Sequence, residues 1–74
     1  MDRFIFDYSK LCGRIIEKCG TRKEFARVIR VSTASLSLKL NNKSYFSQDE
    51  IQRAIQVLDI ESGSVSSYFF TLKL

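Results

Sequence analysis

Few side chains in this sequence could carry out catalysis or bind a metal. The 74 residues include no histidine, no Cys-x-x-Cys pair and no glycine-rich loop that could hold a phosphate. Cys12 and Cys19 are seven positions apart, a spacing that on a helix separates them by about 10 Å along the axis, beyond disulfide reach. Asp49 and Glu50 are better explained as acids in the first turn of a helix. We therefore expect no enzyme, no metal and no cofactor, with both thiols acting as small buried hydrophobes.

The basic side chains are gathered in one part of the chain. Between Lys10 and Lys43 there are nine basic residues and only two acids, Glu17 and Glu24, whereas residues 44–74 carry a net charge of −2. The whole chain has a net charge of +4. This asymmetry is typical of a surface that binds a polyanion such as nucleic acid. Charge alone equally fits ordinary solvated helix faces, so both interpretations stay open at this point.

The stretch STASLSLKLNN, from Ser32 to Asn42, combines hydroxyls with alternating leucines. Alternation is the period of a half-buried strand, but no other segment offers a strand of matching pattern. If Ser32 caps a helix, Leu36 and Leu40 lie four apart on one face, and Leu38 points about 200° away from Leu36. We therefore expect a helix with Leu38 turned outward, although an isolated exposed leucine is common on protein surfaces.

Two helices are expected before this stretch. Asp7 is a plausible N-cap for a helix from about Tyr8 to Cys19 that Gly20 ends. Thr21 and Glu24 have the spacing of a capping box and start a second helix of about nine residues. The residues of these two helices expected to face the core are Leu11, Cys12, Ile15, Ile16, Cys19, Phe25, Ala26 and Ile29.

A second capping box follows the stretch. Ser47 and Glu50 form it, with Phe46 and Ile51 as the hydrophobic staple across the cap, and the helix runs to about Leu58. Its other inward positions are Ala54 and Ile55. Residues 61–64 are expected to form a turn, and a helical turn follows through Tyr68. The apolar ends are expected to close the core through a short two-strand pairing or, alternatively, to form a dimer; these residues are Phe4, Ile5, Phe6, Phe69, Phe70, Leu72 and Leu74.

The predicted fold is a single all-α domain, residues 1–74, of about five short helices. Residues 22–42 form a helix-turn-helix in which Ala26 allows the two helices to approach closely. No apolar run approaches the roughly 20 residues that span a bilayer, and the N-terminus has no signal-peptide layout. We therefore expect a cytoplasmic protein that does not bind membranes.

The run TRKEFARVIRVSTASLSLKLNNKSYFSQDEI resembles the helix-turn-helix of lambda-repressor-like phage regulators. Together with FDYSKLCGRIIEK and the terminal YFF, it is similar to the small Cro-like proteins of temperate phages of Gram-positive bacteria, a group that includes modulators of repression. The resemblance implies a role in the switch between lysis and lysogeny in a bacterial host. In this motif the turn position that is usually glycine is Arg30, which costs on the order of 1 kcal/mol if its φ is positive.

The resemblance also implies a set of binding residues. Those that match the positions facing base edges, or a repressor, are Ser32, Thr33, Ala34, Ser37 and Leu38. Those that match phosphate-contacting positions are Arg22, Lys23, Asn41, Asn42 and Lys43.

Two functions therefore stay open. The first is a Cro-like repressor that binds double-stranded operator DNA, alone or as a homodimer. The second is a modulator that docks on the cognate phage repressor, because Ala34 and Leu38 offer only apolar contact and no side chain at the centre of this face makes a bidentate base contact. A mixed complex with the repressor on DNA would combine the two.

Overall fold

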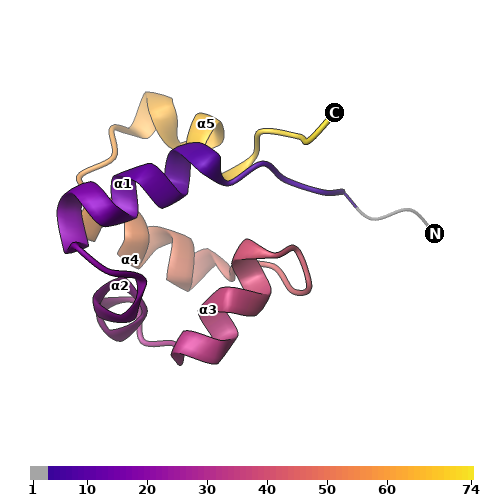
Figure 1. Ribbon diagram of the computed structural model, residues 1–74. Coiled ribbons are helices and arrows are strands. Elements are labelled where there is room, and N and C mark those ends of the chain that lie inside the picture. The colour runs from indigo at the N-terminus through magenta and orange to yellow at the C-terminus, as the bar shows by residue number, and fades with distance from the viewer. Residues whose placement is uncertain (1–3) are drawn as a thin grey trace.

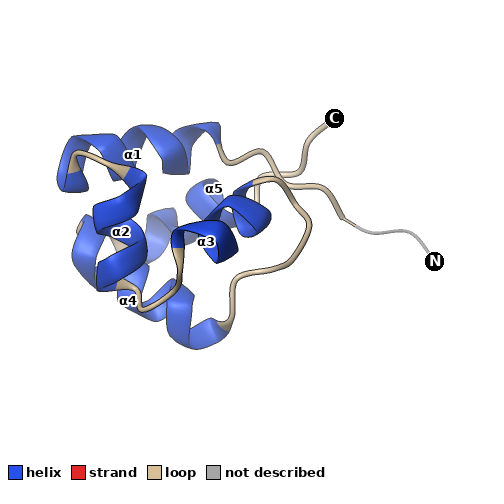
Figure 2. Ribbon diagram, turned by 60° about the horizontal axis from the view of Figure 1, so that its bottom comes forward, coloured by secondary structure: helices blue, strands red, loops and turns tan. Residues whose placement is uncertain are grey.

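The computed structural model describes residues 4–74, which form a bundle of helices (Figure 1). The expected all-α class is confirmed, with the segment between the second and fourth helices folded as a helix and not as a strand (Figure 2). Among the described residues, no helix is long and apolar enough to cross a membrane. The elements are α1 (Ser9–Cys19), α2 (Arg22–Val28), α3 (Thr33–Leu40), α4 (Gln48–Leu58), the 3₁₀ turn η1 (Ser62–Ser64) and α5 (Val65–Phe69).

The core is built from one face of each helix. α1 contributes Leu11 and Ile15, and α2 packs on both α1 and α3. Ile16 was expected to face inward but is 53% exposed, because the core-facing side of α1 is already filled by Leu11 and Ile15. Cys12 and Cys19 are free thiols that are only partly buried. The buried core residues are Tyr8, Leu11, Ile15, Phe25, Ala26, Ile29, Leu36, Phe46, Ala54, Leu58, Ile60 and Phe69.

The helix starts follow the predicted caps with two differences. α1 begins at Ser9, one residue later than expected, and the Asp7 carboxylate accepts a hydrogen bond from the Ser9 N–H at 2.9 Å. The Thr21 hydroxyl accepts from the Glu24 N–H, but the Glu24 carboxylate binds Arg27 instead of returning to the cap, so only half of this capping box forms. α2 is also shorter than predicted, at seven residues.

The cap of α4 forms in full. The Ser47 hydroxyl accepts from the Glu50 N–H at 3.1 Å, and the Glu50 carboxylate accepts from the Ser47 N–H at 2.9 Å. Phe46 is buried and Ile51 partly buried against the core, as expected for the staple.

The two ends of the described chain run side by side away from the helices (Figure 1). The expected terminal pairing is present as a single antiparallel bridge between Phe6 and Leu72. The apolar ends close the core less than expected. Among these residues only Phe69 is buried, and Phe6 is partly buried. We call residues 5–7 with 71–73 the terminal ribbon. Its two hydrogen bonds, both 2.8 Å long, run from the Asp7 N–H to the Thr71 carbonyl and from the Lys73 N–H to the Ile5 carbonyl.

Candidate protein and nucleic-acid interface

α2, α3 and the turn between them form the helix-turn-helix unit, residues 22–40. Buried contacts hold this unit together although its turn is strained. Ala26 and Leu36 are each 1% exposed where α2 and α3 pack together, and the Val31 N–H donates to the Ala26 carbonyl at 3.0 Å. Arg30 has φ of 66°, the left-handed conformation that usually requires glycine. From the other side, the guanidinium of Arg53 donates to the Ile29 carbonyl at 2.9 Å. The turn is therefore fixed by tertiary contacts despite its backbone cost.

One face of α3 is open to solvent and carries the five residues that the sequence places there. The cap of this helix is Ser32, whose hydroxyl accepts from the Ser35 N–H at 3.0 Å. Leu38 is 51% exposed while Leu36 is buried, which confirms the predicted helical phase. We define the α3 face by its exposed residues, which are Ser32, Thr33, Ala34, Ser37 and Leu38.

The chemistry of the α3 face is mild. Its polar groups are hydroxyls, and its other two side chains, Ala34 and Leu38, are apolar. The Asn41 amide donates to the Ser37 carbonyl at 2.9 Å and lies 3.4 Å from the Ser37 hydroxyl, so the end of the helix is held by its own side chains. Such a face can pack against an apolar surface, whereas it offers single hydrogen bonds to bases.

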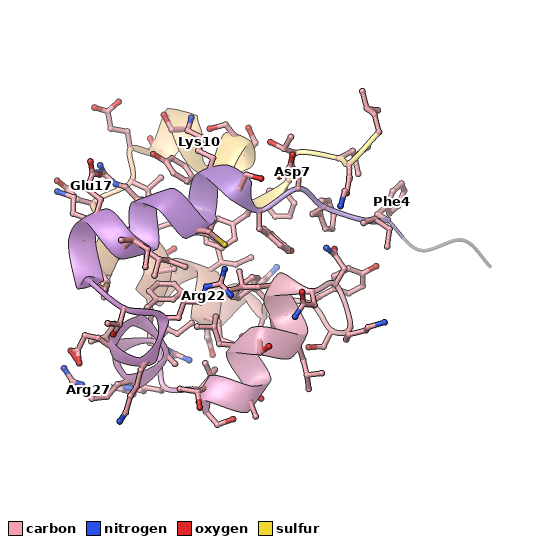
Figure 3. All side chains as sticks on the ribbon, viewed as in Figure 1. Phe4, Asp7, Lys10, Glu17, Arg22 and Arg27 are labelled. Carbon is pink, nitrogen blue, oxygen red and sulfur yellow. The ribbon has the colours of Figure 1, made fainter. Side chains whose placement is uncertain are left out.

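The residues predicted to contact phosphate lie in two different environments. Arg22, Asn41, Asn42 and Lys43 line one cavity of about 580 Å³ beside the terminal ribbon. Lys23 lies instead in a groove of about 390 Å³ between α2 and α3, together with Thr33. The Arg22 guanidinium, labelled in Figure 3, also donates to the Cys12 sulfur at 3.5 Å. Cations therefore flank the α3 face on two sides.

Asn42 has another role in the structure. Its side-chain amide accepts from the Phe6 N–H at 2.8 Å and donates to the Phe6 carbonyl at 2.9 Å. Both of its polar atoms thus bind the N-terminal segment, and its phosphate-contacting role stays a prediction. Lys73 lines the same cavity as Arg22 and Lys43 and was missed from sequence, because only the terminal pairing brings it there.

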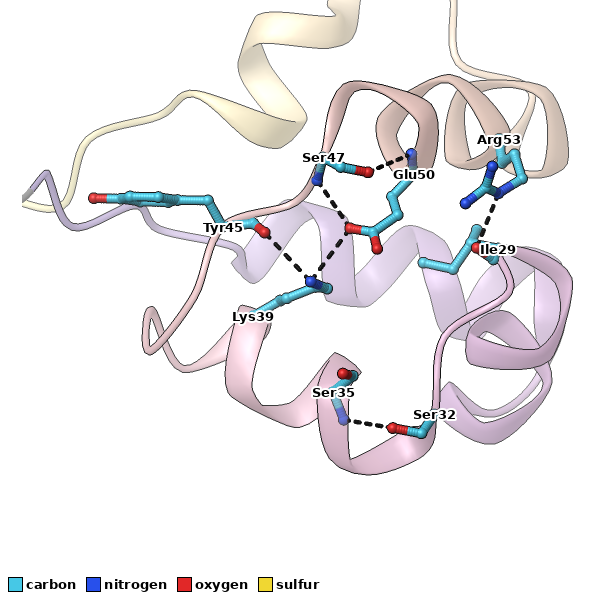
Figure 4. A network of polar contacts seen from close by, with 8 residues as sticks. All are labelled: Ile29, Ser32, Ser35, Lys39, Tyr45, Ser47, Glu50 and Arg53. Atoms are coloured by element: carbon cyan, nitrogen blue, oxygen red, sulfur yellow. Dashed lines mark hydrogen bonds and ion pairs between the residues drawn. The ribbon is translucent and has the colours of Figure 1, made fainter.

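A network behind α3 was also missed. The ammonium of Lys39 lies 3.3 Å from the Glu50 carboxylate and donates to the Tyr45 carbonyl at 3.3 Å (Figure 4). Burial acts to raise the pKa of Glu50, but the bonds from the Ser47 amide and from Lys39 outweigh it and leave the pKa below its ordinary value. The network ties α3 to the start of α4 and so orients the α3 face.

Ion pairs neutralise part of the basic segment. Arg14 pairs with Glu17 and Arg27 with Glu24, each pair three residues apart on one helix. The hydrogen bond from Arg27 lowers the pKa of Glu24, which keeps that carboxylate charged. No group of three His, Cys, Asp or Glu side chains that could hold a metal lies within residues 4–74.

The comparisons with known proteins agree with this geometry. The family model described as "Protein of unknown function (DUF739)" matches residues 4–72. The chain belongs to the DUF739 family. Among solved structures, it is similar to the modulator of repression (MOR) of the temperate bacteriophage TP901-1 from Lactococcus lactis, determined in solution. The identity is 45%, the TM-score is 0.75 and the match covers 88% of each chain. No curated protein matches.

The DUF739 match covers residues 4–72, so it includes the helix-turn-helix unit and both residues of the terminal bridge, Phe6 and Leu72. The similarity to MOR confirms the resemblance to small phage regulators that the sequence motifs indicate.

Proposed function

We propose that this DUF739 protein is a phage regulator of repression that acts together with its cognate phage repressor, which it contacts through the α3 face. The observation that carries the proposal is Leu38, a large apolar side chain that is 51% exposed on a face whose other members are small. The 45% identity with MOR, a modulator of repression, supports the same role. The partner and its DNA set the site of action in the cytoplasm of a bacterial host.

The composition of the α3 face favours a protein partner. Interfaces between proteins have a core depleted of charge and a polar rim. Leu38 and Ala34, four residues apart, supply adjoining apolar contact, and the hydroxyls of Thr33 and Ser37 supply polar groups beside them. A half-exposed leucine gains free energy when a partner covers it, because burying a leucine fully contributes about 1.5–3 kcal/mol.

Operator DNA is the second candidate, supported by a different set of residues. Arg22 and Lys43 on one side of α3 and Lys23 on the other are placed to contact phosphates. Contacts of this kind position a protein on DNA without reading its sequence. The two functions are compatible, because a mixed complex with the repressor would add these cations to the repressor's own DNA contacts.

A gel-shift titration on phage promoter DNA, with and without the purified repressor and at fixed salt, tests the proposal. We expect the protein alone to shift operator and random DNA equally weakly, and to change the repressor's shift when both are present. If the protein alone shifts operator far better than random DNA, it acts as a simple Cro-like repressor and the proposed role as a modulator is wrong. No change in the repressor's shift, with no complex between the two proteins by size-exclusion chromatography, would remove the proposal altogether.

A further inference from the structure

The two edges of the terminal ribbon differ in their backbone hydrogen bonding. Phe6 and Leu72 face each other between the two flanking hydrogen bonds, which makes them a non-hydrogen-bonded pair. In such a pair the backbone N–H and C=O groups of both residues point outward, to the two opposite edges. On the Phe6 edge both groups are taken by the Asn42 amide, at 2.8 and 2.9 Å. A single side chain therefore closes this edge in the way that a third strand would.

The Leu72 edge has no such cover. Within residues 4–74, neither the N–H nor the C=O of Leu72 has a hydrogen-bond partner, and Leu72 is 49% exposed. An unpaired edge of this kind is a template for another strand. The side chains of Leu72 and Leu74 share the face on which Phe6 lies, since alternate residues of an extended segment point the same way. Phe70 is the C-cap residue of α5 and is not extended, but its ring lies beside the same face, with its centroid 6.0 Å from that of Phe6.

The apolar face of the ribbon continues into a groove. This groove has a volume of about 260 Å³, and Phe4, Phe70 and Tyr45 are among its lining residues. None of the residues that line it carries a charge. Two of its lining residues are largely exposed, Phe4 at 66% and Phe70 at 52%. A strand added beside Leu72 would place its own apolar side chains next to Phe70 and hence over this groove.

We propose that the strand added at this edge is the same segment of a second copy of the chain, paired antiparallel about a two-fold axis at Leu72. In this register Leu72 exchanges both backbone hydrogen bonds with Leu72 of the other copy. Thr71 then lies opposite Lys73, and Leu74 of one copy comes near Phe70, at the end of α5, in the other.

The charges of this edge suit a second copy. The only charged side chain of residues 70–74 is Lys73, and it meets threonine, so no like charges oppose each other across the pair.

The area available sets the strength of the dimer. Phe70, Leu72 and Leu74 bring together an apolar area on the order of 300 Å² per copy, well below the roughly 800 Å² per partner of stable complexes. Two backbone hydrogen bonds add to it. We therefore expect a weak dimer, with a dissociation constant of about 0.1 to 1 mM.

Sedimentation equilibrium from about 10 µM to about 2 mM measures this association. Leu72→Pro removes the N–H at the open edge, while the bonds inside the ribbon use the backbone of other residues, and proline is tolerated at a solvent-facing edge. We expect at least tenfold weaker association with an unchanged melting temperature. The matched control Leu72→Ala keeps the N–H and should weaken association less.

A direct measurement of register guards against a proline variant that folds poorly. In a mixed sample of isotope-labelled and unlabelled wild-type protein, the two-fold pairing places the Hα of Thr71 close to the Hα of Lys73 in the other copy, and a filtered NOE between them is expected. A chain that stays monomeric throughout the concentration series overturns the proposal. So does a dimer that survives Leu72→Pro or lacks this NOE.

Discussion

The ammonium of Lys39 lies 3.3 Å from the carboxylate of Glu50, and the two side chains are only 12% and 14% exposed. This contact joins the helix that carries Leu38 to the first turn of α4. Because Glu50 also caps α4 through Ser47, one carboxylate serves both helices. The orientation of the α3 face thus depends on a residue outside the helix-turn-helix unit.

Replacing Glu50 by Gln should lower the free energy of unfolding by about 1–2 kcal/mol, because Lys39 is then left partly buried without its partner. Glutamine keeps an oxygen that can accept from the Ser47 N–H, so the cap itself is retained. Urea unfolding measures the loss. Lys39→Met and the double variant complete a cycle, in which we expect a coupling of about 1 kcal/mol. Additive losses would mean that the two side chains do not interact.

The same carboxylate should make stability depend on pH. The pKa of Glu50 in the folded protein is lowered from the ordinary value of 4.5 for a glutamate side chain. A lowered folded pKa means that the contribution is fully present above the unfolded pKa and is lost as the pH falls through the folded one. The unfolding free energy of the wild type should therefore decline below about pH 4.5 more steeply than that of Glu50→Gln. Parallel curves for the two proteins would contradict this.

Arg30→Gly should stabilise the protein by about 0.5 kcal/mol. A non-glycine residue in the left-handed region costs roughly 1–2 kcal/mol, and the greater freedom of glycine in the unfolded chain offsets part of that gain. The φ of 66° at this position is the basis of the prediction. Arg30→Ala is the control, since it removes the side chain and keeps the strain. An equal gain in both variants, measured by urea unfolding, would trace the effect to the charge.

Features of the chain that depend on residues three or four apart could be predicted from the sequence. The Ser32 cap, the Ser47 capping box and the outward turn of Leu38 all follow from local spacing, and the structure has each of them. The predicted capping role of Glu24 was wrong, because Arg27, three residues later, binds the same carboxylate. That competition is local too, but its outcome depends on side-chain geometry that spacing does not set.

Contacts between distant parts of the chain could not be predicted in this way. Asn42 and Phe6 are 36 positions apart, and nothing in either neighbourhood signals that one will bind the backbone of the other. The approach of Lys73 to the cavity beside α3 depends on the same pairing of the termini. Such contacts follow from how the helices pack, so they become visible only in three dimensions.

Leu38→Ser should abolish or strongly weaken association with the repressor and leave the melting temperature nearly unchanged. Leu38 is half exposed, so its loss removes little from the core, while a partner that covers it loses its apolar anchor. Leu36→Ala is the matched comparison: it removes a fully buried side chain and should cost about 2–5 kcal/mol. Thermal melts and a pull-down with the repressor measure the two effects. Intact binding by a folded Leu38→Ser protein would show that the α3 face is not the docking surface.

Asn42→Gly should release the N-terminal segment of the terminal ribbon. It removes both hydrogen bonds to Phe6 and keeps a residue that accepts the φ of 62° found at this position. We expect a loss of about 1–2 kcal/mol in unfolding free energy and faster hydrogen exchange of the Phe6 amide.

Asn42→Asp tests the two hydrogen bonds to the Phe6 backbone separately. The carboxylate can still accept from the Phe6 N–H but cannot donate to the Phe6 carbonyl, so the amide of Phe6 should stay protected while stability falls. Asn42→Ala loses the same bonds as the glycine variant and adds strain at a positive φ, so it should be the least stable of the three. This order depends on the amide acting as a substitute strand along the Phe6 edge. If the Phe6 amide exchanges equally fast in the wild type and in Asn42→Gly, the edge is open already, and the asymmetry between the two edges of the ribbon is lost.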